Sequence, residues 1–188
     1  MLFKERLELI RLDYEVRRVR VIFLKDYAGL PTPSGALDVK RGDEIELPRW
    51  QARLLKDLGF VDVRDPPIDV DYINVVHFRE RRRAGDHVNP VPQDFYLRSS
   101  ELIEKLDRLI RESPSGMLLR DREVAEKNLL DIGETRLSKL LRLAYSLAED
   151  VRDKMSPEEA IIYNHVVKAV EAWRGYLKSL TSRGERRG

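Results

Sequence analysis

The sequence predicts an α+β protein in which a small, mainly β domain is followed by an all-α helical bundle domain. Short β-branched and aromatic segments separated by Gly and Pro fill residues 1–66, whereas residues 67–188 carry long apolar repeats at helical spacing. At the junction, Pro66 and Pro67 can continue neither a helix nor a strand ladder. We therefore expect two domains, 1–66 and 67–188, with a frayed tail over 181–188.

The first domain opens with an ambiguous segment. Partial alternation from Glu8 to Leu24 predicts two strands or a bulged strand, while Phe3, Leu7 and Ile10 fit a helix over the first ten residues. Both readings stay open. The glycines and prolines of Asp26–Gly35 predict a loop.

The rest of the first domain reads as strand, helix and strand. We expect strands over Glu44–Leu47 and Phe60–Val63, and between them a helix that Pro48 opens and Gly59 ends. Its expected apolar face consists of Trp50, Leu54, Leu55 and Leu58.

The second domain is expected to consist of helices. Their approximate ranges are Val70–Arg82, Gln93–Arg111, Leu118–Asp153 with a bend at Gly133, and Ser156–Leu180. The last helix has a strong start, because Ser156 suits an N-cap, Pro157 the first helical position and Glu159 a capping box.

Two of these helices have more apolar residues than one core face needs. One face of the long helix gathers Leu137, Leu140, Leu141, Ala144, Leu147, Ala148 and Val151, with Leu143 and Tyr145 outside it. In the last helix the main face gathers Ile162, Val166, Ala169, Val170, Trp173, Leu177 and Leu180, with Ile161 and Val167 outside it. Such a surplus is usually a second contact inside a bundle, and its alternative is subunit association.

The composition excludes several functional classes. The chain has no cysteine, which rules out disulfides, thiolate zinc sites and a thiol nucleophile. No apolar run approaches the roughly 18 residues of a membrane span, so we expect a soluble cytoplasmic protein without membrane contact. His77, His87 and His165 lie in separate segments, and phosphate-binding loops and a nucleophile elbow are absent. We expect no catalytic site, metal or cofactor, although scattered carboxylates leave an unrecognised enzyme as an alternative.

Charge is abundant but balanced. Charged residues make up 36% of the chain, with 35 basic against 33 acidic side chains, a level typical of proteins from thermophiles. Residues 1–66 contain 13 basic and 12 acidic residues, and residues 67–188 contain 22 and 21. Neither half has the basic excess of a dedicated DNA-binding domain. Any DNA contact is therefore expected to be weak and local, and its best candidate is the patch Arg79, Arg81, Arg82 and Arg83.

The order of several motifs resembles that of a known family. The motifs lie at Glu46–Lys56, Phe60–Val63, Ile68–Asp71, Phe78–Arg81, Pro90–Tyr96, Glu134–Leu140 and Met155–Glu159. This order resembles the GINS subunits of archaeal and eukaryotic DNA replication in which the small B-type β domain precedes the A-type helical domain. The resemblance covers about residues 43–180.

The resemblance implies a non-catalytic scaffold. GINS subunits assemble through their helical domains, in archaea as a 2:2 tetramer with a second subunit type or with copies of one type. The complex bridges the MCM helicase and a RecJ-like protein in the replicative helicase at replication forks, which would place this chain with the nucleoid. The main alternative is a nucleic-acid-binding module that uses the Arg79–Arg83 patch.

The resemblance also implies roles for individual residues. Arg136 and Lys139 would form buried or interfacial ion pairs on the long helix. The association surface would consist of Arg136, Lys139, Leu140, Leu143, Trp173 and Tyr176. Trp50 would pack in the β domain or between the domains, and Tyr96 would cap the junction between a loop and the helical domain.

Overall fold

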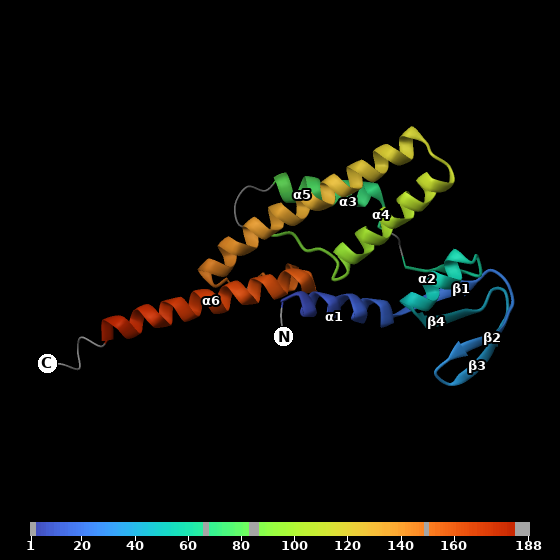
Figure 1. Ribbon diagram of the computed structural model, residues 1–188, viewed down its shortest axis with the longest axis horizontal. Helices are drawn as coiled ribbons and strands as arrows, with labels where there is room; N and C mark the ends of the chain where they lie inside the picture. Colours follow the sequence, from blue (N-terminus) through green and yellow to red (C-terminus); the bar gives the residue numbers. More distant parts are fainter. Residues whose placement is uncertain (1–2, 66–67, 83–86, 149–150, 183–188) are drawn as a thin grey trace. The chain divides into compact units, whose positions relative to one another are not determined.

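The chain is a mixed α+β protein with a small sheet region and a long helical part (Figure 1). The computed structural model describes residues 3–65, 68–82, 87–148 and 151–182. The chain divides into two compact units, Met1–Pro67 and Ile68–Gly188. This division falls one residue from the expected domain boundary.

The first unit combines two helices with two small antiparallel sheets. Its elements are α1 (Phe3–Val16), β1 (Arg18–Phe23), β2 (Tyr27–Thr32), β3 (Gly35–Val39), β4 (Glu44–Pro48), α2 (Arg49–Asp57) and β5 (Val61–Val63). β1 is the central strand of a sheet in the order β4-β1-β5, and β2 pairs with β3 in a separate hairpin.

The ambiguous segment at the start is helical. The strand expected from Glu8 is wrong as far as Val16, and the helical alternative is confirmed. α1 packs on α2, where the buried Tyr14 ring lies 4.4 Å from the Arg49 guanidinium and Glu15 pairs with Arg53 at 2.9 Å. These contacts with a later helix override the alternating pattern, which continues as a strand only from Arg18.

The loop expected over Asp26–Gly35 is also wrong, because most of it forms the β2–β3 hairpin. The register of the hairpin shifts between Tyr27 and Leu30, where Gly29 has a φ of 71°. The Gly29 amide donates to Asp38 Oδ1 at 2.7 Å. The glycine that indicated a loop therefore supplies a bulge inside a strand.

α2 turns a different face inward from the one expected. Gln51, Ala52 and Leu55 are buried, and the Gln51 side chain donates to the Pro31 carbonyl oxygen at 3.0 Å. Leu54 and Leu58 are exposed, so of the expected apolar face only Leu55 joins the core. Pro48 ends β4 and caps α2 instead of occupying its first turn. The core consists of Val19, Val21, Phe23, Leu30, Val39, Leu47, Ala52, Leu55 and Val61.

The second unit is helical apart from its loops. Its elements are α3 (Val70–Arg82), α4 (Phe95–Glu112), α5 (Gly116–Ser146), the short 3-10 helix η1 (Arg152–Lys154) and α6 (Pro157–Ser182). α5 packs against α3, α4 and α6. α5 runs uninterrupted through Gly133 and ends before Leu147, whose φ of 59° is left-handed, so the helix expected to reach Asp153 is shorter than predicted.

α6 begins as the sequence predicts. The Glu159 amide donates to Ser156 Oγ at 3.3 Å, and the Ser156 amide donates to Glu159 Oε2 at 3.0 Å. This reciprocal pair is a complete capping box, which is confirmed. Of the frayed tail expected over 181–188, residues 181 and 182 belong to α6, and residues 183–188 lie outside the described residues.

Two clusters form the core of the helical unit. One joins α3, α4 and the first half of α5 around Ile73, Phe95, Leu106, Ala125 and Ile132. The other joins α5 to the start of α6 and consists of Val88, Leu140, Ala144, Val151, Met155 and Tyr163, with Leu143, Val166 and Val167 packed on it.

Candidate functional site

A buried ionic cluster, defined here as Glu80, Arg136, Lys139 and Glu159, links α3, α5 and α6 inside the helical unit. Arg136 of α5 is fully buried. Its guanidinium binds Glu159 through both carboxylate oxygens, with Nε to Oε1 at 2.6 Å and Nη2 to Oε2 at 2.8 Å. Its Nη1 donates to Glu80 Oε1 at 2.7 Å. Bidentate pairing of this kind fixes direction as well as distance.

Lys139 lies one turn after Arg136 and completes the charge balance. Its ammonium donates to Glu80 Oε2 and to the Glu80 carbonyl oxygen, each at 2.8 Å. Arg136 also donates to the Asn89 carbonyl oxygen at 2.6 Å and to the Lys154 carbonyl oxygen at 3.0 Å. Two cations therefore face two carboxylates, and backbone oxygens accept further guanidinium hydrogens.

The surroundings keep the Glu80 carboxylate ionised. Burial by itself raises the pKa of Glu80, but the hydrogen bond from Lys139 and the charges of Arg136 and Lys139 outweigh it and hold the pKa below its usual value. Tyr96 of α4 donates its hydroxyl hydrogen to Glu159 Oε1 at 2.6 Å. Burial and the negative charge of Glu159 raise the Tyr96 pKa far above its usual value, so the phenol stays protonated.

This arrangement suits a structural role better than catalysis. A general acid or base works best with a pKa near the working pH. Here the pKa of Glu80 lies below its usual value and the pKa of Tyr96 lies far above its usual value. The cluster instead joins α3, α4, α5 and the first turn of α6, because Glu159 is at once the capping residue of α6 and the partner of Arg136 and Tyr96. It therefore fixes the position at which α6 begins.

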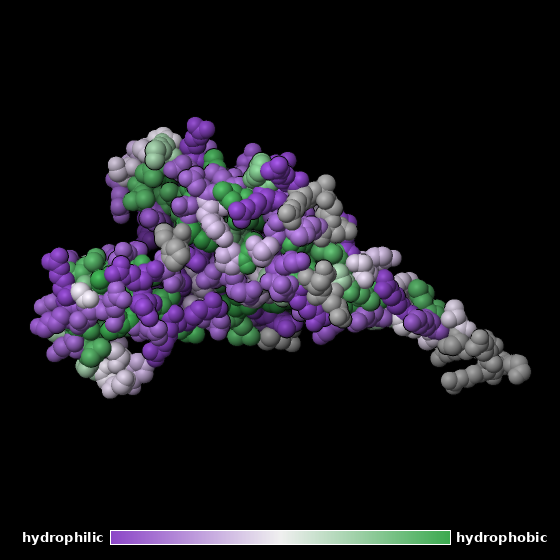
Figure 2. Space-filling view, turned by 180° about the vertical axis from the view of Figure 1, so that it is seen from behind, coloured by the Kyte–Doolittle hydropathy of each residue, from purple (hydrophilic) through white to green (hydrophobic). Residues whose placement is uncertain are grey.

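The later part of α6 presents a row of large apolar side chains, named here the α6 apolar face and consisting of Trp173, Tyr176, Leu177 and Leu180. Their exposed fractions are 59%, 55%, 42% and 48%. The positions fall at intervals of three and four residues, on one side of the helix. This part of α6 extends past the end of α5 (Figure 1), and Figure 2 shows green apolar atoms at the surface along it. The face is the strongest candidate site for binding another protein.

The expected association surface therefore needs correction. Arg136, Lys139 and Leu140 are buried within the unit, with exposed fractions of 0%, 4% and 1%, and so are not part of its surface. Leu143 packs half-buried on the core cluster that contains Leu140. Of the six residues, only Trp173 and Tyr176 are exposed, with ring centroids 6.0 Å apart.

The two remaining aromatic candidates differ in their surroundings. Trp50 is 48% exposed on α2, so it is not a core residue of the first unit, and its position between domains stays a prediction. Tyr96 links the start of α4 to the capping box of α6.

The arginine patch has no single role. Arg81 pairs with Asp131 of α5 at 3.7 Å, and Arg82 lies over the Phe78 ring at 5.6 Å. Arg79 is exposed on α3, and Arg83 lies outside the described residues.

Glu80, between these arginines, is the residue that sequence reasoning missed. The arginines around Glu80 predict a basic patch, yet Glu80 follows the buried Ile73 and Val76 of α3 at intervals of three and four residues. That core periodicity was the available signal. A charged residue at a buried helix position requires a partner, and Arg136 and Lys139 occupy buried positions one turn apart on α5.

The histidines of the described chain do not converge on a site. His77 faces Asp131, with 3.1 Å between Nε2 and Oδ2, and His165 Nδ1 lies 2.7 Å from the Ile161 carbonyl oxygen. Among the described residues, no three His, Asp or Glu side chains are grouped closely enough to hold a metal ion.

No protein-family model matches this chain, and no curated protein matches it significantly. In the part of the chain that the structure describes, no helix has both the length and the apolar character needed to cross a bilayer.

Proposed function

We propose that this chain is a non-catalytic scaffold subunit of GINS type, which associates with a second subunit type or with copies of itself through its helical unit. The resulting assembly bridges the MCM helicase and a RecJ-like protein in the replicative helicase. The order of sequence motifs supports the family, and the α6 apolar face is the one observation that supports association.

Association through this face is favourable because it removes apolar surface from water. Burial of apolar surface contributes about 25 cal/mol per Å², and a large aromatic side chain buries about 150–250 Å². Trp173 and Tyr176 lie next to each other and are more than half exposed, so their burial against a partner helix would contribute several kcal/mol. Aromatic residues of this kind are typical anchors of protein interfaces.

The test is the mass of the assembled protein. We expect the chain, alone or with its second subunit, to form an assembly larger than a monomer at about 10 μM, as measured by light scattering after size exclusion. The double variant Trp173→Glu/Leu177→Glu should convert it to a helical monomer, because two carboxylates cannot be buried unpaired. Met117→Glu, which changes another exposed apolar residue (73% exposed), is the matched control and should leave the mass unchanged.

The bridging role needs a second measurement. Purified chain and subunit partner should capture purified MCM helicase and RecJ-like protein on a resin, and the double variant should not. A folded monomer that captures neither protein would remove the proposal. Tight binding to DNA at physiological salt, lost on substitution of Arg81 and Arg82, would favour the nucleic-acid module instead.

A further inference from the structure

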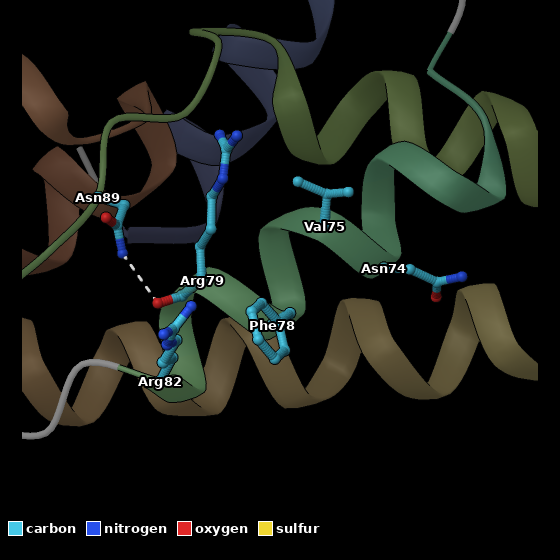
Figure 3. A pocket seen from close by; sticks show the side chains of 6 residues that line it. All are labelled: Asn74, Val75, Phe78, Arg79, Arg82 and Asn89. Carbon is cyan, nitrogen blue, oxygen red and sulfur yellow. Dashed lines mark hydrogen bonds between the residues drawn. The ribbon is translucent and has the colours of Figure 1, made fainter.

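A second apolar surface lies on α3, on the side that does not contribute Ile73, Val76 and Glu80 to the core. Tyr72, Val75 and Phe78 follow one another at intervals of three residues, with exposed fractions of 38%, 45% and 60%. Beside them is a hollow of about 770 Å³, lined by Asn74, Val75, Phe78, Arg79, Arg82 and Asn89 (Figure 3). Surfaces of this kind, concave and partly apolar, are suited to ligand side chains.

The hollow carries positive charge. Arg79 and Arg82 are exposed, and within the described part of the chain neither forms an ion pair. Arg82 lies beside Phe78 (Figure 3). The nearby carboxylates do not offset this charge, because Glu80 is buried against Arg136 and Lys139, and Asp131 pairs with His77 and Arg81.

Two hydrogen bonds attach Asn89, a residue that lines the hollow, to the last turns of α3. The Asn89 side chain donates to the Arg79 carbonyl oxygen at 3.3 Å (Figure 3). The Asn89 amide donates to Glu80 Oε1 at 3.1 Å. Asn89 is thus tied to α3 and, through Glu80, to the ionic cluster. A residue held in this way loses less conformational entropy on binding than an unattached one.

From the chemistry of this hollow we infer that it binds an acidic amphipathic peptide segment of another protein. The apolar residues of the segment contact Val75 and Phe78, while its Asp or Glu side chains pair with Arg79 and Arg82. Such a segment binds in the manner of a helix in a groove, with charged groups at the rim of an apolar contact. The inference goes beyond the proposed function, since it uses α3 and stands whether or not α6 associates.

The charge distribution favours a peptide over nucleic acid. Residues 67–188 contain 22 basic and 21 acidic side chains, so no broad positive field surrounds the hollow. Nucleic-acid affinity comes from several phosphate contacts, whereas two guanidiniums beside an apolar strip match one or two carboxylates.

The test is a selection of random peptides of about 16 residues, displayed on phage, against the full-length protein. We expect the enriched peptides to combine Asp or Glu with Leu, Ile or Phe at helical spacing. Their affinity, measured by fluorescence anisotropy, should weaken about tenfold or more with Arg79→Glu/Arg82→Glu, because like charges then face each other. Arg111→Glu/Arg120→Glu changes two other exposed arginines by the same charge and should leave affinity within about twofold.

Each other outcome overturns the inference. The inference is wrong if no peptide is enriched, or if the enriched peptides lack acidic residues. It is also wrong if Arg79→Glu/Arg82→Glu leaves the peptide affinity unchanged. A labelled oligothymidylate of about 20 nucleotides, bound at physiological salt and released by this double variant, would assign the hollow to single-stranded nucleic acid. The mass of the assembly is measured on the same variants, so loss of α6 association is distinguished from loss of peptide binding.

Discussion

The two ends of α6 differ in how the chain uses them. In the first turns, Glu159 is bound by Arg136, Tyr96 and the Ser156 amide, and Ile161 and Tyr163 are buried. In the last turns, the α6 apolar face is about half exposed. One continuous helix therefore begins in a network of hydrogen bonds around Glu159 and ends in half-exposed aromatic and aliphatic side chains.

This difference indicates that the start of α6 stabilises the fold and that its end is available for binding. Polar groups that are buried must be paired within the same chain, because an unpaired buried charge costs several kcal/mol. Exposed apolar groups cost far less and remain available to a partner. The ionic cluster thus positions the helix, and the far end presents the apolar face.

The largest effect is expected at the first end of the helix. Arg136→Met leaves Glu80 and Glu159 buried without their main cation and should lower the free energy of unfolding by about 3–5 kcal/mol. Urea unfolding followed by far-UV circular dichroism measures this change. Arg120→Met, at an exposed position of α5, should change it by less than about 0.5 kcal/mol. A loss below about 1 kcal/mol for Arg136→Met would contradict the structural role of the cluster.

A smaller effect is expected in acid. The folded-state pKa of Glu80 is held below its usual 4.5, so the unfolded chain takes up the proton first. The stability that this carboxylate contributes is complete above about pH 4.5 and is lost as the pH falls through the folded-state pKa. Unfolding measured from pH 7 to pH 3 should show this loss, and Glu80→Gln should flatten it while Glu123→Gln, at an exposed position, leaves it unchanged. An identical pH profile for Glu80→Gln would show that Glu80 is not ionised in the folded protein.

The smallest effect is expected at the far end. Leu177→Ser should change the free energy of unfolding of the monomer by no more than about 0.5 kcal/mol, because Leu177 is 42% exposed. Ile161→Ala in the same helix is the matched comparison and should cost about 2–4 kcal/mol, because Ile161 is only 7% exposed. Equal losses for the two variants would mean that the far end of α6 also packs within its own chain.

Local signals predicted the helical unit well. The expected range Val70–Arg82 matches α3, and the Ser156–Glu159 capping box starts α6 as predicted. These features depend on neighbouring residues in the chain, such as a side chain that accepts from an amide three positions later. The candidate site was predicted in part: Trp173 and Tyr176 are exposed, whereas Arg136, Lys139 and Leu140 are buried.

The sequence predicted the wrong buried residues where contacts with distant segments determine which side of a helix is covered. On α5, Leu141 belongs to the expected apolar face but is 42% exposed, while Leu143, expected outside it, packs on the core. On α6, Ile161 and Val167 are expected outside the main face, yet Ile161 is buried and Val167 packs on the core. Periodicity shows that a helix has apolar sides, but the neighbouring helices select which side is covered.

The sequence by itself determined helix α3, the strands β1, β4 and β5, the balanced charge and the capping box of α6, because each depends on composition or on contacts a few residues apart. Only the tertiary structure decided that Phe3–Val16 is a helix, that Glu80 pairs with Arg136 and Lys139, and that Leu140 is buried within the unit. The physical reason is burial: the cost of burying a charge or the gain from burying an apolar side chain depends on the groups that surround it. Those groups come from distant segments, as in the pairs of Arg136 with Glu159 (separation 23) and with Glu80 (separation 56).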